Sequence, residues 1–412
     1  MLTHINIDGF KSIHKIQDLE LGKINVIIGA NGSGKTNLLE AIGVLSAALT
    51  GRIDSESLRS RGVRLSPNEL YKTSLKEKNR QQKITFRAEG NWDDISLKYH
   101  LEVNPQSTDD RLWTYEVDDL WHGHKKIIEK DSISDPTSQW EAGDAIIHDI
   151  GGRVAYLGER IDYKSVGQAP KIMISYLREY AIYTPITPML RGVQPDTTSR
   201  DPIGLMGGRL AEAVDDILNL NKGTFGELNL DEVLELLDWV DDFRITTPSR
   251  ELLSPDVPSL RNIVEFKDYW MGMKANRISG YDASEGSLYV LFMLVLAQHP
   301  RAAHFFAIDN FDQALNPRLA RALTRLFCRL ILEAKSTKQV FLTTHNPLVL
   351  DGLNLRDDRI RLFTAERNQS SGGATVISRV HLSDKVLKSA ENGTPLSQMW
   401  VMGLLGGVPD IF

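Results

Sequence analysis

Gly29-Ala30-Asn31-Gly32-Ser33-Gly34-Lys35-Thr36 is the most informative segment of this chain. It follows an apolar run that ends at Ile28 and precedes a helical pattern that begins near Leu38, so it is expected to join a strand to a helix. Glycines allow the backbone to curve closely around phosphate groups, and the first N–H groups of a helix present positive potential to them. The segment therefore predicts a phosphate-binding P-loop that includes Asn31, Gly32, Ser33 and Gly34.

The two residues that end the P-loop have side chains suited to a nucleotide and its metal ion. Lys35 is expected to reach the β- and γ-phosphates, and the hydroxyl of Thr36 is expected to hold Mg²⁺. The sequence therefore predicts ATP and Mg²⁺ as cofactors.

Composition narrows the class of protein. The chain has 412 residues, of which 42% are hydrophobic, so it can form two or three domains or one elaborated domain. A net charge of −6 argues against a globally basic nucleic-acid binder but allows a local basic groove. The single cysteine, Cys328, excludes an intramolecular disulfide and suits a reducing compartment. No signal-peptide pattern or membrane-spanning apolar run is visible, so a cytoplasmic location without a membrane partner is expected.

Four further elements follow in a fixed order in the second half of the chain. Ser284-Glu285-Gly286 precedes an apolar helical run, Asp309 and then Asn310 follow an apolar strand, and His345 ends the next strand. Each element alone is weak, because such a serine is usually a helix cap and a lone histidine is usually structural. Their joint order is far more specific than any one of them.

This order, together with the P-loop, resembles the ABC-type ATPase head of the SMC/RecF group. More narrowly, it resembles the compact AAA-family ATPases related to the overcoming-lysogenization-defect (OLD) proteins. The resemblance covers residues 1–50 and 276–350. It implies that residues 29–36 are Walker A, that Ser284, Glu285 and Gly286 are the signature motif, that Asp309 is the Walker B acid at the metal, and that His345 is the switch histidine. Lys11, in Phe10-Lys11-Ser12, matches a segment that lies beside the nucleotide in this group.

The resemblance implies an α/β fold, a P-loop NTPase of the ABC-type head class with two additions. Short β-rich pieces from Lys83 to about Lys130 predict an antiparallel β-lobe, and apolar residues at helical spacing between about 205 and 243 predict an inserted helical lobe. The expected parts are residues 1–204 with Walker A and the β-lobe, 205–275 as the helical lobe, 276–380 with the signature, Walker B and switch histidine, and 381–412 as a tail.

In that group two protomers share each ATP site. Walker A of one protomer binds ATP, and the signature serine of the other faces the γ-phosphate with the N-terminus of its helix. The resemblance therefore implies an ATP-dependent homodimer, or a higher assembly, with two composite sites.

One position departs from the family pattern. Most of these ATPases place a catalytic glutamate after the Walker B aspartate, and this chain has Asn310, whose amide cannot act as a general base. Two interpretations follow: hydrolysis is slow and the ATP-bound dimer acts as a long-lived switch, or Asp312 supplies the missing carboxylate. The glutamine that senses Mg²⁺ in ABC heads is not identified, since neither Gln168 nor Gln194 has a convincing context.

Family resemblance suggests that the protein gates a separate effector, such as a nuclease or toxin, in bacterial defence against phage. The alternative is a DNA repair or recombination ATPase that binds duplex DNA, for which the cluster Arg59, Arg61 and Arg64 offers phosphate contacts. The motor of a membrane transporter fits less well, because the signature lacks the usual Leu-Ser-Gly-Gly run. The C-terminal tail contains Trp400, which either packs on the core or anchors a partner protein.

Overall fold

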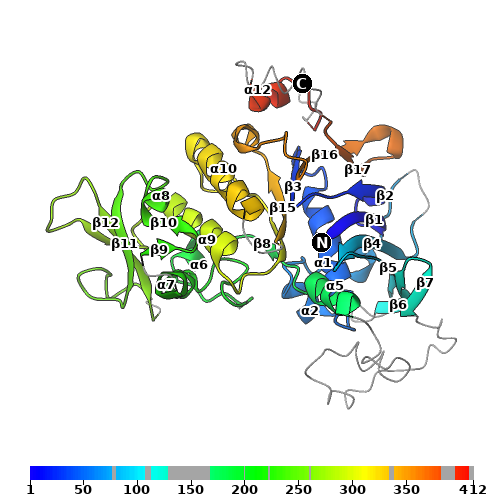
Figure 1. Cartoon of the computed structure of the whole chain (residues 1–412), viewed down its shortest axis with the longest axis horizontal. Coiled ribbons are helices and arrows are strands. Elements are labelled where there is room, and N and C mark those ends of the chain that lie inside the picture. Colours follow the sequence, from blue (N-terminus) through cyan, green and yellow to red (C-terminus); the bar gives the residue numbers. More distant parts are fainter. Residues whose placement is uncertain are drawn as a thin grey trace, which may run out of the picture.

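The computed structural model describes most of the chain: residues 1–76, 80–106, 113–128, 168–198, 200–220, 223–258, 261–333, 338–381 and 395–407. A mostly parallel sheet runs through the middle of the molecule, with an antiparallel sheet on one side and a mixed helical lobe on the other (Figure 1).

The parallel sheet carries the P-loop. Its strand order is β17-β16-β3-β15-β14-β8, in which only β17 runs antiparallel to its neighbour. The strands are β3 (Ile24–Gly29), β8 (Ile182–Tyr183), β14 (Phe305–Ile308), β15 (Gln339–Thr344), β16 (Ile360–Asn368) and β17 (Ala374–Arg379). Since β3, β8, β14 and β15 are parallel, their carboxyl ends meet at one edge of the sheet.

Both faces of this sheet are buried, which explains its unbroken apolar strands. Side chains alternate between two hydrophobic cores: Val26 and Ile28 face the core beneath the helical lobe, and Ile27 faces the core shared with the antiparallel sheet. Phe306 and Phe305 of β14 divide between the cores in the same way.

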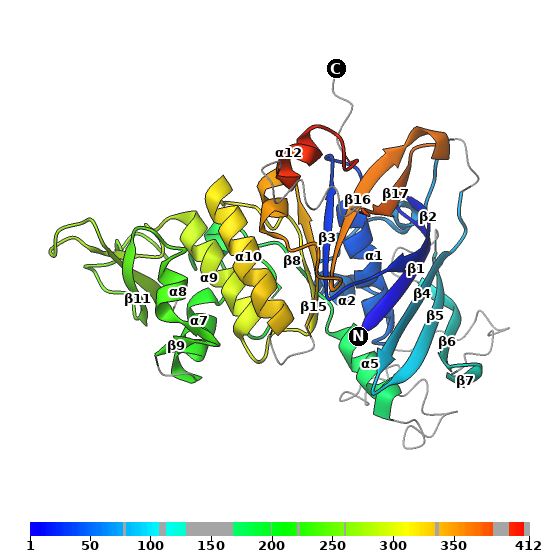
Figure 2. The ribbon, with the colours of Figure 1, turned by 45° about the horizontal axis from the view of Figure 1, so that its top comes forward.

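The antiparallel sheet confirms the predicted β-lobe. Its order is β2-β1-β4-β5-β6-β7, with strands β1 (Leu2–Phe10), β2 (Ile13–Glu20), β4 (Ile84–Trp92), β5 (Ile95–Pro105), β6 (Trp113–His122) and β7 (Lys125–Ile128). The last two residues of the expected range, 129 and 130, lie outside the described residues. Helix α1 (Lys35–Ala48) lies between this sheet and the parallel sheet (Figure 2), and α5 (Gln168–Arg178) packs beside it.

The lobe on the other face is only partly helical. Helices α9 (Glu285–Gln298) and α10 (Pro317–Glu333) cover the sheet, and α6 (Thr187–Leu190) and α7 (Leu210–Leu220) pack on α9. The helical period expected up to residue 243 ends early, because α8 (Leu230–Leu234) stops and Val240 opens a strand. Residues 240–246 pair with the next strand, Ile263–Asp268, across a connecting segment, and local helical periodicity does not reveal that pairing. The strands here are β9 (Thr224–Phe225), β10 (Leu228–Asn229), β11 (Val240–Thr246), β12 (Ile263–Asp268) and β13 (Arg277–Ser279).

The tail contains a short helix, α12 (Leu396–Val401), that packs on the 3₁₀ helix η1 (Pro347–Gly352). Trp400 is buried together with Leu396 and Met399, so the tryptophan packs on its own chain, while Val401, Met402 and Leu404 remain exposed. The other short elements are α2 (Ser55–Arg59), α3 (Asn68–Tyr71) and η2 (Gln369–Ser371). Among the described residues, none of the helices is long and apolar enough to cross a membrane.

Candidate nucleotide site

The P-loop adopts a backbone that glycine alone accommodates at two points. Gly34 has φ of 104°, and a Cβ there would lie 2.2 Å from the Thr375 Oγ1 atom. Gly29 has φ of 153°, and a Cβ there would lie 2.3 Å from the Ala365 carbonyl oxygen. The loop is therefore pressed against β16 and β17, which fixes its shape before any ligand arrives.

Lys35 lies folded against its own loop. Its ammonium group donates to the carbonyl oxygens of Gly29 and Ala30 at 2.8 and 2.9 Å, and it lies 3.4 Å from the Nδ1 atom of His345. Burial lowers the pKa of Lys35 to about 8, against the opposing effect of the nearby carboxylates Asp309 and Asp312. The positive charge is therefore held at the mouth of the loop.

Thr36 and Asp309 bring two oxygen ligands together, as the sequence predicts. The Thr36 hydroxyl donates to Asp309 Oδ2 at 2.9 Å, and the hydroxyl of Thr343 donates to Asp309 Oδ1 at 2.5 Å. Mg²⁺ in proteins is typically held by one or two such oxygens, with water and phosphate completing its shell. The pair therefore fits Mg²⁺ bound with a nucleotide. Among the described residues no group of three or more His, Cys, Asp or Glu could hold a metal by itself.

Asn310 and Asp312, on which the two interpretations of hydrolysis rest, differ in their surroundings. Asn310 has a left-handed backbone with φ of 59°, pinned by a bond from its N–H to the Thr343 hydroxyl at 2.9 Å and by the Tyr289 hydroxyl, which donates to its carbonyl at 3.0 Å. Asp312 accepts the N–H of His345 at 3.2 Å, and its charge acts on Lys35. Asp312 therefore lies in the same group of side chains as Lys35 and His345.

The surroundings of His345 disfavour the protonated form of its imidazole. Burial lowers its pKa, and the adjacent Lys35 ammonium lowers it further. Because an ammonium group can only donate, the Nδ1 atom of His345 accepts from Lys35, and the ring proton lies on Nε2.

Lys11 contacts the P-loop helix rather than the loop itself. Its ammonium group lies 2.6 Å from the buried carboxylate of Glu40 on α1, which Arg64 also contacts at 2.7 Å. The next residue, Ser12, lies 2.7 Å from the Thr375 hydroxyl and accepts from Asn37. Lys11 and Arg64 line an open cleft of about 460 Å³ together with residues in and around α3.

The three arginines after the P-loop helix, Arg59, Arg61 and Arg64, have different surroundings in the structure. Arg61 is buried and donates to the Ser46 hydroxyl at 2.7 Å and to the Ser57 carbonyl at 2.8 Å. Arg64 is paired with Glu40, and Arg59 is exposed. Arg61 therefore has an internal structural role, and the three side chains do not form one surface for phosphates.

The Glu40 cluster yields a stability prediction. Glu40→Ala should lower the free energy of unfolding by about 3 kcal/mol, since removing one partner leaves a buried charge uncompensated. Glu89→Ala is the control, because its pair with Lys98 is half exposed and should contribute about 1 kcal/mol or less. Urea unfolding of both variants measures the difference, and equal losses would contradict the prediction.

The signature residues lie on the far side of the parallel sheet from α1 (Figure 1). Ser284 is exposed at the start of α9 and makes no capping hydrogen bond, and Glu285 accepts from the Thr187 hydroxyl. A Cβ at Gly286 would lie 3.1 Å from the Ala314 carbonyl, so the helix start packs on the loop after Asp309. Within the described part of the chain, no hydrogen bond or ion pair joins residues 284–286 to the P-loop.

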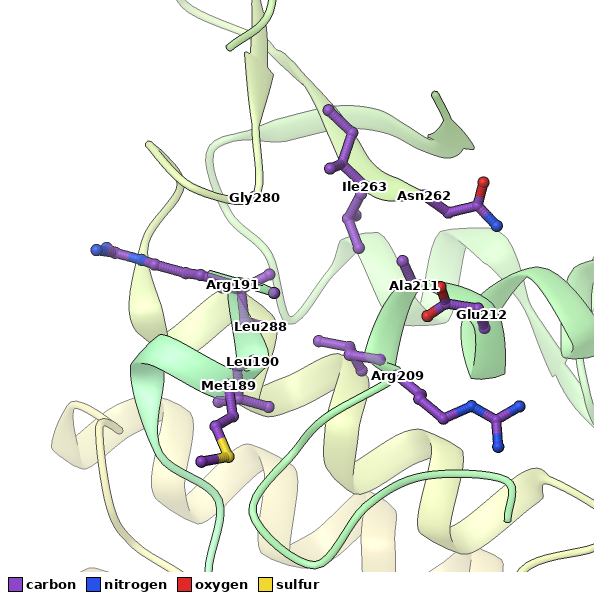
Figure 3. A pocket seen from close by; sticks show the side chains of 13 residues that line it. Met189, Leu190, Arg191, Arg209, Ala211, Glu212, Asn262, Ile263, Gly280 and Leu288 are labelled. Atoms are coloured by element: carbon purple, nitrogen blue, oxygen red, sulfur yellow. The ribbon is translucent and has the colours of Figure 1, made fainter. Parts of the chain in front are cut away.

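A small cavity behind the signature segment is not a substrate site. It lies between α6 and the start of β12, with Arg191, Gly280 and Leu288 among its lining residues (Figure 3). Its volume is about 20 Å³, which is room for a single water molecule.

Several residues that hold the site in place were missed by the sequence analysis. Thr343 joins Asp309 to the backbone of Asn310, and Tyr289 fixes that backbone from α9. Ile308 of β14 pairs with Tyr183 of β8. The next residues of the two strands, Asp309 and Thr184, therefore lie at the same edge of the sheet, where the site is. The Thr-Thr-His order at the end of β15 was the one local signal for Thr343.

No hydrogen bond in the described part of the chain joins either candidate for the Mg²⁺-sensing glutamine to Lys35, Thr36 or Asp309. Gln168 begins α5, at the end of that helix remote from β8, and is exposed. Gln194 is also exposed, and its N–H donates to the Pro188 carbonyl.

Comparison with known proteins agrees with this geometry. A family model described as "AAA domain" matches residues 4–164, and one described as "AAA domain, putative AbiEii toxin, Type IV TA system" matches residues 249–351. The chain is 40% identical over 57 residues to the DNA replication and repair protein RecF of Paenarthrobacter aurescens (strain TC1), which is 14% of each chain. It is 54% identical over 41 residues to RecF of Shewanella sp. (strain W3-18-1), 10% of this chain and 11% of the relative. These alignments span a small part of either protein.

A solved structure shows the fold across nearly the whole chain. The Smc head bound to the C-winged helix domain of ScpA superposes with a TM-score of 0.54 at 13% identity, covering 94% of this chain and 99% of that one. The predicted α/β P-loop fold of the ABC-type head is thereby confirmed.

Proposed function

We propose that this chain, which resembles the SMC/RecF-like ABC-type ATPases in its fold and in the order of its motifs, binds ATP with Mg²⁺ at the P-loop, dimerises on ATP and hydrolyses it. The observation that carries the proposal is the convergence of Lys35, Thr36 and Asp309, joined by His345, at one edge of the parallel sheet. Lys35 would bind the β- and γ-phosphates, Thr36 and Asp309 would hold Mg²⁺, and the metal ion would neutralise charge on the phosphates.

Dimerisation is supported by the exposed signature. Ser284 begins a buried helix yet leaves its hydroxyl in solvent, and it has no described contact with the P-loop of its own chain. A helix N-terminus favours a negative charge, more strongly once an interface excludes water. In the proposed dimer, Ser284 of the partner subunit faces the γ-phosphate, so each site is complete only when two copies meet.

The proposed cellular role is to gate a separate effector, such as a nuclease or toxin, in bacterial defence against phage. The match of residues 249–351 to the AbiEii-type AAA family supports this role. The alternative is a DNA repair ATPase, which the short RecF alignments favour, although the internal position of Arg61 removes part of the predicted DNA surface. Duplex DNA that raises ATP turnover would favour the alternative, and a stoichiometric complex with an effector would favour the first role.

Asp312 is the proposed catalytic carboxylate. Asp312→Asn should lower ATP turnover by about 10²–10⁴-fold, the range for a positioned acid–base group, while leaving ATP affinity within about twofold. The asparagine oxygen can still accept the His345 N–H, so the variant removes the charge and basicity but keeps this contact. Single-turnover kinetics with separate binding measurements gives both quantities.

The control for this experiment is Asn310→Ala, which leaves both backbone bonds of Asn310 in place and should change turnover little. If Asp312→Asn turns over ATP at the wild-type rate, Asp312 is not the catalytic carboxylate. The other interpretation then holds, in which Asn310 makes hydrolysis slow and the ATP-bound dimer long-lived. Asn310→Glu should then raise turnover, and the mass of the ATP-bound protein should report a long-lived dimer.

ATP binding should depend on pH through Lys35. Phosphate favours the charged ammonium, and in the free protein this group has a pKa of about 8. Affinity should therefore be constant below pH 8 and fall about tenfold per pH unit above it. Calorimetry at pH 9 in two buffers of different ionisation enthalpy should show proton uptake on binding, and no uptake would contradict the prediction.

A further inference from the structure

The C-terminal segment of residues 395–407, here called the C-terminal strap, is anchored at two points. At its start, the backbone N–H and hydroxyl of Ser397 donate to the two carboxylate oxygens of Asp351 on η1, at 3.0 and 2.6 Å. At its end, the N–H of Gly407 donates to the carboxylate of Glu366 on β16. Helix α12, which contains the first anchor, lies over the end of the parallel sheet (Figure 2).

The second anchor touches the P-loop itself. Gly407 has φ of 73°, and a Cβ there would lie 3.4 Å from the Gly29 Cα and 3.3 Å from the Thr364 Cγ2 atom. Gly406 is also left-handed, with φ of 76°. The chain therefore turns sharply here and passes directly over the first residue of the P-loop.

Both anchors connect to the contacts of Lys35. Gly29, under the second anchor, accepts from the Lys35 ammonium at 2.8 Å. His345, which contacts the same ammonium at 3.4 Å, is followed by Asn346, the N-cap of η1, and η1 carries Asp351 of the first anchor. The Lys35 side chain thus contacts both Gly29, which lies under the second anchor, and His345, which leads into the helix that carries the first anchor.

Lys35 cannot keep all these contacts when a phosphate binds. An ammonium group has three donors, and in this structure they meet three acceptors: Gly29, Ala30 and His345. A phosphate oxygen bound to Lys35 must displace at least one of them. Each of these residues either contacts the strap directly or adjoins a segment that does.

We propose that the C-terminal strap is a nucleotide-sensing element, held by its two anchors when the P-loop is free of ATP and loosened when ATP draws Lys35 away. The inference rests on ATP binding at the P-loop, as proposed above. ATP binding would then change the protein surface at two places. One is the signature, and the other is the strap with its exposed side chains Val401, Met402 and Leu404.

Hydrogen–deuterium exchange of the full-length protein tests the proposal. Amides of residues 396–407 should exchange about fivefold faster or more with saturating Mg²⁺ and a non-hydrolysable ATP analogue than without, as expected for a loosened local element. Binding of a fluorescent ATP analogue is measured in parallel. If no nucleotide binds, the proposed function fails; if nucleotide binds and exchange is unchanged or slower, the strap proposal fails.

Coupling must also work in reverse, because linkage between two sites is reciprocal. Glu366→Ala removes the acceptor of the Gly407 N–H, and Ser397→Ala removes one of the bonds to Asp351. Each should speed exchange of the strap without nucleotide and tighten ATP binding by about fivefold, within the usual range of allosteric coupling. Met402→Ala, a change at an exposed strap position, should alter neither quantity. A loosened strap with unchanged ATP affinity in both anchor variants would overturn the proposal.

Discussion

Lys35→Ala is expected to weaken ATP binding by about 100-fold or more, because a charge-assisted hydrogen bond contributes about 1.5–3 kcal/mol and this ammonium group would make at least two to phosphate. The fold should survive, since Lys35 contacts only nearby loop carbonyls and His345. Titration with a fluorescent ATP analogue, together with circular dichroism, measures the loss of binding and confirms that the protein is folded.

The chain offers a matched control for this variant. Lys338 is also a buried lysine bonded to carbonyls, at 2.8 Å from Leu296 and Ala297, and burial lowers its pKa to about 8 as well. It closes the end of α9, away from the P-loop. Lys338→Met should cost stability and leave ATP affinity unchanged, so an equal loss of affinity in both variants would show that the effect of Lys35→Ala is not specific to phosphate.

The second large effect is expected from mixed dimers. Ser284→Arg should abolish turnover alone, because it removes the signature hydroxyl that faces the γ-phosphate at both sites, and Lys35→Ala should abolish it alone through lost binding. A mixed dimer of the two has one intact site, built from the P-loop of the Ser284→Arg protomer and the signature of the Lys35→Ala protomer. With random pairing, the mixture should recover about a quarter of wild-type turnover.

Steady-state ATPase assays of each variant and of the equimolar mixture measure this recovery, with analytical ultracentrifugation to follow assembly. The control is an equimolar mixture of the Lys35→Ala and Asp309→Ala proteins. Both changes disable the P-loop half of a composite site, so no intact site can form in any pairing. Recovery in that control, or none in the first mixture, would contradict the composite site.

Local sequence was sufficient for the P-loop and for the order of the later motifs. A strand, a glycine-rich turn and a helix follow one another within contiguous residues, so their conformations are set by neighbours along the chain. The predicted β-lobe was also recoverable, since β4 to β7 are consecutive strands that pair with their neighbours. Prediction failed at β11, whose partner β12 lies beyond a long connection.

The electrostatic roles of single residues could not be read from their positions. Arg59, Arg61 and Arg64 look alike in the sequence, yet Arg61 is buried among backbone acceptors and Arg64 is tied to Glu40. Asn310 and Asp312 likewise stand as alternatives in the sequence, and only the structure shows that Asp312 accepts the backbone N–H of His345. Whether a side chain is buried, and which group it bonds to, depends on residues that other segments of the chain place beside it. No local sequence pattern encodes those neighbours.

The sequence by itself thus determined the fold class, the phosphate-binding loop and the residues available for a nucleotide and Mg²⁺, because these are properties of contiguous segments. Only the folded chain could bring Thr36 to Asp309, which is 273 positions away, and set the C-terminal strap on Gly29. The physical reason is that such contacts arise where parallel strands from distant parts of the chain end at one edge, a consequence of sheet order and packing rather than of local propensity.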